Sequence, residues 1–85
     1  AGILATLGWV YYQMGAYEQA VEVYREILKL RYIPAQVLYH LGLAYHRMGR
    51  RQEAVQALKE FLKVGRQLPE GKDAASLLST LGVSP

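Results

Sequence analysis

The 85-residue chain contains no cysteine, which excludes disulfides, thiolate nucleophiles and zinc sites with cysteine ligands. It also lacks any run of about 18 apolar residues, so no membrane-spanning helix is expected. A signal-peptide pattern is missing from its beginning. The first residue is Ala1 rather than Met, and we expect the sequence to be part of a longer protein, with any targeting segment outside it. A cytoplasmic and an envelope-associated location therefore both stay open.

Acidic residues are scarce in the middle of the chain. Basic and acidic residues balance over residues 1–34, whereas residues 35–69 carry a net charge of +4 and residues 70–85 a net charge of −1. A basic stretch of this kind can attract an anionic partner, here through Arg47, Arg50, Arg51 and Lys59. Basic helix faces are more often solvated surface, and nucleic acid is not the partner that we expect.

A repeat dominates the sequence. Residues 7–30, LGWVYYQMGAYEQAVEVYREILKL, return 34 positions later as residues 41–64, LGLAYHRMGRRQEAVQALKEFLKV. Identical pairs at this shift include Leu4 and Leu38, Leu7 and Leu41, Gly8 and Gly42, Tyr11 and Tyr45, Met14 and Met48, Gly15 and Gly49, Ala20 and Ala54, Val21 and Val55, and Leu28 and Leu62. A fixed period of this length indicates a repeat architecture, in which similar units stack on one another.

Apolar residues recur at helical spacing in five segments, which predicts an all-α fold with helices over 3–14, 17–30, 35–48, 51–64 and 72–81. Gly15 and Gly49 would end the first and third helices. Because the connections there are short, each pair of helices must fold back as an antiparallel hairpin. Gly8 and Gly42 would let the paired helices approach closely. The residues expected to face inward are Leu4, Leu7, Gly8, Tyr11, Tyr17, Ala20, Val21, Tyr24, Ile27, Leu28, Leu38, Leu41, Gly42, Tyr45, Ala54, Val55, Leu58, Phe61, Leu62, Ala74, Leu77, Leu78 and Leu81.

The chain is expected to form a single domain over residues 1–85. Residues 1–34 would be the first repeat and residues 35–69 the second. A break is expected over 31–34, because Pro34 disfavours helical backbone at the residue before it. Residues 70–82 would form a capping helix, in which Leu78 replaces the glycine of the two repeats. Residues 83–85 would be a frayed tail.

These features resemble the tetratricopeptide repeat family, whose period and pattern they match. The residues that carry the resemblance are Leu7, Gly8, Tyr11, Gly15, Ala20, Tyr24 and Pro34 in the first copy, and Leu41, Gly42, Tyr45, Gly49, Ala54, Phe61 and Pro69 in the second. The family's early tryptophan is Leu4 and Leu38 here, and both prolines come late. The stretches TLGWVYYQMG and AVQALKEFLK, followed by a short leucine-rich helix, are similar to the C-terminal repeats of longer bacterial members of the family.

The resemblance implies a right-handed α-solenoid of two helix hairpins plus the capping helix, without enzymatic activity or a cofactor. The first helix of each repeat would line a concave face on which a partner docks. The expected partner-binding residues on that face are Ala5, Trp9, Tyr12, Gln13, Tyr39, Leu43, His46 and Arg47. The alternative is that Trp9, Tyr12 and Leu43 pack between adjacent first helices and face no ligand.

No catalytic or metal site is expected. His40 and His46 are six residues apart and cannot share a helical face as two metal ligands would. His40 is interpreted as a partly exposed side chain on the second repeat. Some members of the family bind chaperone tails, holding the C-terminal carboxylate with Lys and Asn. The corresponding places here carry Ala5, Trp9, Tyr39 and Leu43, so a heat-shock chaperone tail is not expected.

Two functions fit this sequence. The first is a protein-interaction scaffold that binds a peptide or helix of a partner protein through the aromatic residues, which are frequent anchors of interfaces. The second is an architectural segment of a longer repeat array. In that case an open N-terminal end near Ile3, Thr6 and Val10 would expose apolar surface and drive self-association into a homo-oligomer.

Overall fold

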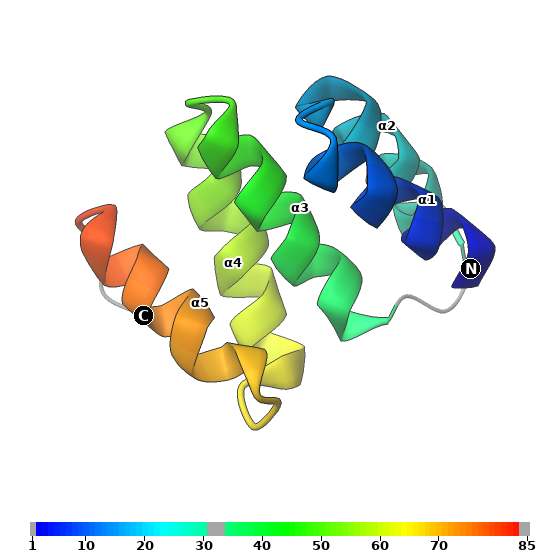
Figure 1. The fold of residues 1–85 in the computed structure, drawn as a ribbon. Coiled ribbons are helices and arrows are strands. Elements are labelled where there is room, and N and C mark those ends of the chain that lie inside the picture. The colour runs from blue at the N-terminus through cyan, green and yellow to red at the C-terminus, as the bar shows by residue number, and fades with distance from the viewer. Residues whose placement is uncertain (1, 31–33, 84–85) are drawn as a thin grey trace.

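A computed structural model describes residues 2–30 and 34–83 of the chain. Over these residues the fold consists of five α-helices: α1 (Gly2–Gln13), α2 (Tyr17–Leu28), α3 (Ala35–Arg47), α4 (Arg51–Gly65) and α5 (Glu70–Thr80). Each helix packs on the next one in the chain, from α1 on α2 through to α5 on α4 (Figure 1). The predicted all-α fold of two helix pairs and a fifth helix is confirmed. In the described part of the chain, no helix is long and apolar enough to cross a membrane.

The same tight turn closes both helix pairs. Gly15 and Gly49 have φ angles of 80° and 76°, the left-handed backbone that glycine adopts without a steric cost. In the first turn, the N–H of Ala16 donates to the carbonyl oxygen of Tyr11 at 2.9 Å, and the second turn repeats this bond one period later. These bonds satisfy carbonyl groups that a helix end would otherwise leave free. The predicted helix ends at the two glycines are therefore confirmed.

Two other helix ends differ from the prediction. Helix α2 ends at Leu28 rather than Leu30, and residues 31–33 of the break predicted over 31–34 fall outside the described residues. Helix α5 begins at Glu70, two residues before the predicted start at Lys72. The sequence predicts a later start for this helix because the apolar spacing begins only at Ala74. Pro69 already has helical backbone angles, and the fixed φ of proline suits the start of a helix.

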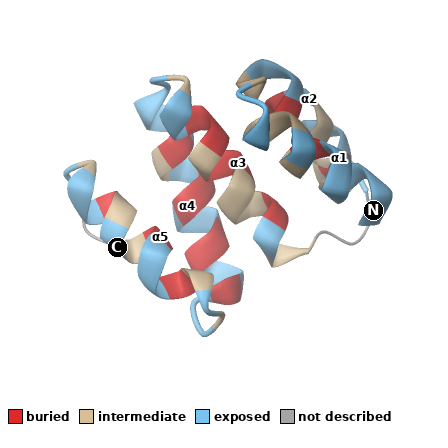
Figure 2. Ribbon diagram, viewed as in Figure 1, coloured by how far each residue is buried: buried red, intermediate tan, exposed pale blue. Residues whose placement is uncertain are grey.

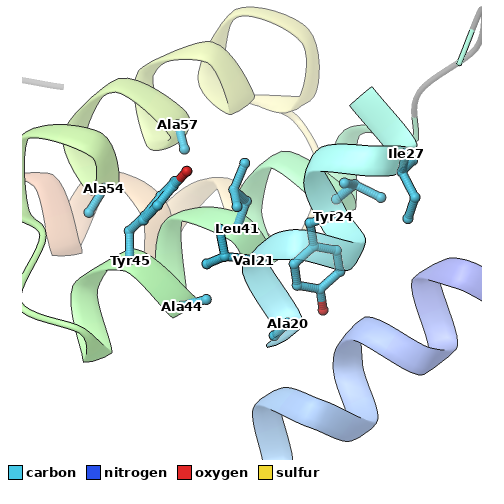
Figure 3. Close-up of a cluster of buried hydrophobic side chains, with 10 residues drawn as sticks. Ala20, Val21, Tyr24, Ile27, Leu41, Ala44, Tyr45, Ala54 and Ala57 are labelled. Carbon is cyan, nitrogen blue, oxygen red and sulfur yellow. The ribbon is translucent and has the colours of Figure 1, made fainter. Parts of the chain in front are cut away.

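The buried residues form two clusters that follow one another along the order of the helices (Figure 2). One cluster joins α2 to α3 and α4. Figure 3 shows Tyr45 of α3 directed toward Ala57 of α4, whereas Tyr24 of α2 is directed toward α1. The buried members of this cluster are Ala20, Val21, Tyr24, Ile27, Val37, Leu41, Ala44, Tyr45, Ala54 and Ala57. A second cluster joins α4 to α5 through Leu58, Phe61, Leu62, Ala74 and Leu78. Leu78 thus fills the space that a glycine leaves to a neighbour in each repeat.

Gly8 and Gly42 are sites of close helix approach, as predicted. A Cβ atom on Gly8 would come within 2.7 Å of the Tyr24 ring, and one on Gly42 within 2.8 Å of the Leu58 side chain. Contacts this short do not occur between real atoms, so neither position has room for a side chain. The space that each glycine leaves is filled by a large side chain of the partner helix.

The inward face predicted for α1 is confirmed for Gly8 and Tyr11, which packs against the core, and wrong for Leu4 and Leu7. Gly8 is the only buried residue of this helix, and Leu4 and Leu7 remain 36% and 39% exposed. The reason is that α1 packs mainly on α2, whereas α3 lies between α2 and α4. The same arrangement buries Val37 and Ala44 of α3, which were not predicted to face inward. A helix buries as much of its surface as its neighbours cover.

Hydrogen bonds fix the C-terminal end of α5. The guanidinium of Arg51, at the start of α4, donates from Nε to the carbonyl oxygen of Leu81 at 2.9 Å. Val83, predicted to be frayed, donates its N–H to the carbonyl oxygen of Leu78 at 2.9 Å and is half-buried. The rest of the predicted tail, residues 84–85, lies outside the described residues.

Candidate functional site

Aromatic rings of α1 and α3 form a continuous row across the two repeats, here called the aromatic shelf (Tyr12, Trp9, His40 and Tyr39). The ring centroids of Trp9 and Tyr12 lie 5.1 Å apart with nearly parallel planes. Those of Trp9 and His40 lie 4.4 Å apart, and those of His40 and Tyr39 lie 5.7 Å apart. Trp9 and Tyr12 are neighbours because residues three apart share a helical face.

His40 is central to the shelf, and it is half-buried, as expected for a partly exposed side chain. Its ring lies against Trp9 of α1, and it also lies 6.1 Å from the ring of Tyr24 in α2. Burial lowers the pKa of His40, and the negative charge of Glu70 opposes that shift. Helical spacing is compatible with this role, since His40 lies three residues before Leu43 and seven before Arg47 on one helical face, but spacing alone does not distinguish His40 from His46.

Four of the predicted site residues come together. Trp9, Tyr12 and Tyr39 belong to the aromatic shelf, and Arg47 joins it because its Nε donates to the hydroxyl oxygen of Tyr12 at 3.4 Å. This bond also raises the pKa of the Arg47 guanidinium. Each of the three rings is half-buried. The rings of the shelf therefore pack between helices, and each ring still exposes part of its surface.

The remaining predicted residues flank the shelf. Ala5 and Leu43 are half-buried, and Gln13 and His46 are exposed. None of the ring contacts in the described part of the chain involves His46. The imidazole that contacts Trp9 belongs to His40, six residues earlier on α3.

The two ends of the aromatic shelf have different neighbouring residues. At the α1 end, the Tyr12 ring meets the edge of Tyr17 at 5.3 Å. At the α5 end, the Tyr39 ring lies 5.4 Å from Phe61 of the core. Burial raises the pKa of Tyr39, as do the negative charges of Asp73 and Glu70. One end of the shelf thus carries the positive charge of Arg47, and the other end lies near two carboxylates.

Two buried polar atoms near the shelf have no hydrogen-bond partner among the described residues: the hydroxyl oxygen of Tyr24 and Oε1 of Glu70. Burial raises the pKa of Tyr24 to about 12, with a smaller contribution from Tyr12. Tyr24 points toward α1 (Figure 3), where Gly8 leaves room for its ring. Buried polar groups are nearly always paired in folded proteins, so both atoms are unusual.

Comparisons with known proteins agree with the fold of the chain. Family models described as "TPR repeat" and "Tetratricopeptide repeat" match residues 8–49 and 36–64. The fold is similar to that of PcrH, whose crystal structure was solved in complex with the chaperone binding region of PopB. The TM-score is 0.82 and the sequence identity 23% over 95% of this chain, which spans 66% of the PcrH chain. No curated protein matches the sequence significantly.

Proposed function

Because the chain belongs to the tetratricopeptide repeat family, we propose that it is a non-enzymatic scaffold that binds a peptide or helix of a partner protein on the concave face, across the aromatic shelf. The family resemblance inferred from the sequence is confirmed, and proteins of this family bind partner peptides. PcrH has a similar fold, and its crystal structure was solved in complex with the chaperone binding region of PopB.

One observation carries the proposal: the 4.4 Å contact between Trp9 and His40. This contact joins the rows of both repeats into one surface, so a single extended segment could touch all of it. Rings that are half-buried are held in place by the fold, and a partner can cover their remaining surface without a large loss of side-chain entropy. Aromatic side chains and arginine are the residue types that most often dominate binding energy.

The residues would have different roles. The rings of Trp9, Tyr12 and Tyr39 would contact apolar side chains of the partner. Arg47 would donate to carbonyl or carboxylate oxygens, because its bond to Tyr12 uses one of five donor hydrogens. The residues on the margin of this surface would be Ala5, Gln13, Leu43 and His46.

The test is a selection of peptides from a random library on the chain, followed by titration of a labelled selected peptide. We expect the variants Trp9→Ala and Tyr12→Ala to bind about tenfold more weakly or worse. Val64→Ala is the matched control, since Val64 is 60% exposed on α4. Circular dichroism must show the helical signal of each variant intact. Peptides that bind the variants as tightly as the wild-type chain would contradict the proposal.

A second function is favoured by the exposed stripe of α1. Ile3, Leu7, Val10 and Met14 recur at helical spacing, and Ile3 and Met14 are 87% and 72% exposed. As an architectural segment, the chain would self-associate through this stripe or stack on a neighbouring repeat. Sedimentation velocity over a range of concentrations would then show a dimer that Ile3→Glu dissociates and Val64→Glu does not. A monomer at every concentration would exclude self-association.

A further inference from the structure

One side of α1 carries a stripe of exposed apolar side chains, here called the α1 stripe (Ile3, Leu7, Val10 and Met14). One period later, the chain carries Val37, Leu41, Ala44 and Met48. The first three of these are buried and the fourth is half-buried. Ile3 is 87% exposed, whereas its counterpart Val37 is 2% exposed. Equivalent apolar positions are thus covered in the second repeat and uncovered in the first.

Helix α2 packs over the α3 positions. The two helices lie against each other, and Val37, Leu41 and Ala44 share one buried cluster with the apolar face of α2, which consists of Ala20, Val21, Tyr24 and Ile27. Leu28 of α2 also lines a cavity of about 230 Å³ together with Leu38 and Leu41. Because α1 and α3 are copies of one unit, and each pairs with the helix that follows it, the helix that fits the α1 stripe is one that resembles α2.

The composition of α1 also indicates a covered helix. Among the five helices of the described chain, α1 is the only one without an aspartate, glutamate, lysine or arginine, and Thr6 and Gln13 are its only residues that are neither glycine, apolar nor aromatic. A helix on a protein surface normally combines an apolar face with a charged one, and a helix that is apolar on most sides is normally buried. A contiguous exposed apolar surface on such a helix marks a site of interaction.

The α1 stripe and the aromatic shelf lie on different sides of α1. Successive residues of an α-helix are rotated by about 100° around its axis, which turns Ile3, Leu7 and Val10 away from Trp9 and Tyr12. A helix bound along the α1 stripe would therefore leave the shelf open to a peptide.

We infer that the α1 stripe is the docking site for an amphipathic helix of a partner protein whose apolar face repeats that of α2, with apolar residues at positions i, i+1, i+4, i+7 and i+8. This helix would lie along α1 as α2 lies along α3. A second copy of the folded chain offers no free helix of this type, because the apolar face of its own α2 is buried. The inference rests on the architectural function, for which it names the partner, and it is independent of the aromatic shelf.

The probe is a synthetic peptide with the sequence of residues 17–28, YEQAVEVYREIL, held helical by a hydrocarbon crosslink that replaces Glu22 and Glu26. These two residues are exposed in α2, so the crosslink lies off the apolar face. The peptide is titrated into the isotope-labelled wild-type chain, and binding is followed by nuclear magnetic resonance. We expect the amide signals of Ile3, Leu7 and Val10 to shift.

Variants of the chain locate the docking site. We expect Ile3→Glu and Val10→Glu to weaken binding of the peptide about tenfold or more, because each places a charge beneath the apolar face of the helix. Val64→Glu, the same change on an exposed valine of α4, is the matched control and should bind as the wild-type chain does. Since Ile3 and Val10 are exposed, both variants should keep the helical signal and the melting temperature. A peptide that carries Val21→Asp and Ile27→Asp should not bind.

The outcomes separate the inference from the functions proposed above. No binding of the helical peptide up to about 1 mM would overturn the docking site. If the chain then forms a dimer that Ile3→Glu dissociates, the stripe binds a second copy and the architectural function stands, whereas a monomer would overturn both. Binding that Ile3→Glu and Val10→Glu leave unchanged would also overturn the inference, because the peptide would occupy another surface. Peptides selected on the aromatic shelf depend on Trp9 and Tyr12, so none of these results bears on the proposed scaffold.

Discussion

The indole ring of Trp9 and the imidazole ring of His40 lie 4.4 Å apart with 27° between their planes. One residue comes from the first helix of the first repeat and the other from the first helix of the second repeat. Their contact turns two short aromatic rows into one surface. Trp9 is the only tryptophan of the chain, so its fluorescence reports directly on this contact.

The stability of the fold should fall in mild acid through His40. Burial lowers the pKa of this imidazole in the folded chain below its ordinary value of 6.5, with Glu70 opposing the shift. The unfolded chain therefore binds the proton more readily. The stabilisation is complete above pH 6.5, decreases as the pH falls through the unfolded and then the folded pKa, and is constant below both.

Thermal melts at about pH 7.5 and about pH 5, on either side of the ordinary histidine range, measure this effect. His40→Gln should reduce the difference between the two melting temperatures. His46→Gln should retain it, because His46 is exposed and makes no ring contact within the described residues. An unchanged difference in His40→Gln would assign the pH dependence to other groups.

Gly8→Ala should destabilise the fold although alanine is the better helix former. The new Cβ would lie 2.7 Å from the Tyr24 ring, and overpacking of this kind costs about 1–3 kcal/mol. The gain in helix propensity, about 1 kcal/mol, offsets only part of that cost. Gly2→Ala is the control, since nothing lies within 4 Å of its new Cβ. Urea unfolding of both variants decides the matter, and equal stability would show that the Tyr24 ring moves aside freely.

Tyr24→Phe should leave stability unchanged or raise it by up to about 1 kcal/mol. The hydroxyl oxygen is buried without a hydrogen-bond partner among the described residues, and removing an unsatisfied polar atom recovers the cost of burying it. Chemical denaturation measures the difference from the wild-type chain. A loss of more than about 1 kcal/mol would mean that the hydroxyl forms a hydrogen bond in solution.

Arg51→Ala should loosen the capping helix. The hydrogen bond from its Nε to the carbonyl oxygen of Leu81 joins α4 to the end of α5, and one such bond contributes about 0.5–1.5 kcal/mol. Amide hydrogen exchange should become faster in α5 than in the other helices. Arg50→Ala is the control, because Arg50 makes an exposed ion pair with Glu53 at 3.7 Å, which contributes about 0–1 kcal/mol. Equal protection of the α5 amides in both variants would show that the hydrogen bond from Arg51 does not hold this helix.

Part of the candidate site could be predicted from the sequence. The resemblance placed Trp9, Tyr12, Tyr39 and Arg47 on one face, and the structure brings these four together. The order of the rings could not be predicted, because it depends on which residue of α3 meets Trp9, and helical spacing alone fits both His40 and His46. The carboxylate of Glu70 was missed because it stands 30 residues from His40 and belongs to another helix.

The sequence by itself determined the period of 34, the five helices and the glycine turns at Gly15 and Gly49, because these depend on spacing and backbone preference within a few residues. Only the tertiary structure decided which faces are covered. Leu7 and Leu41 occupy the same position in the two copies, yet Leu7 is 39% exposed and Leu41 is buried. Their helices have different neighbours, since α3 lies between α2 and α4 whereas α1 packs mainly on α2. The burial of a residue depends on which neighbouring helices cover it, and a local sequence pattern does not determine this.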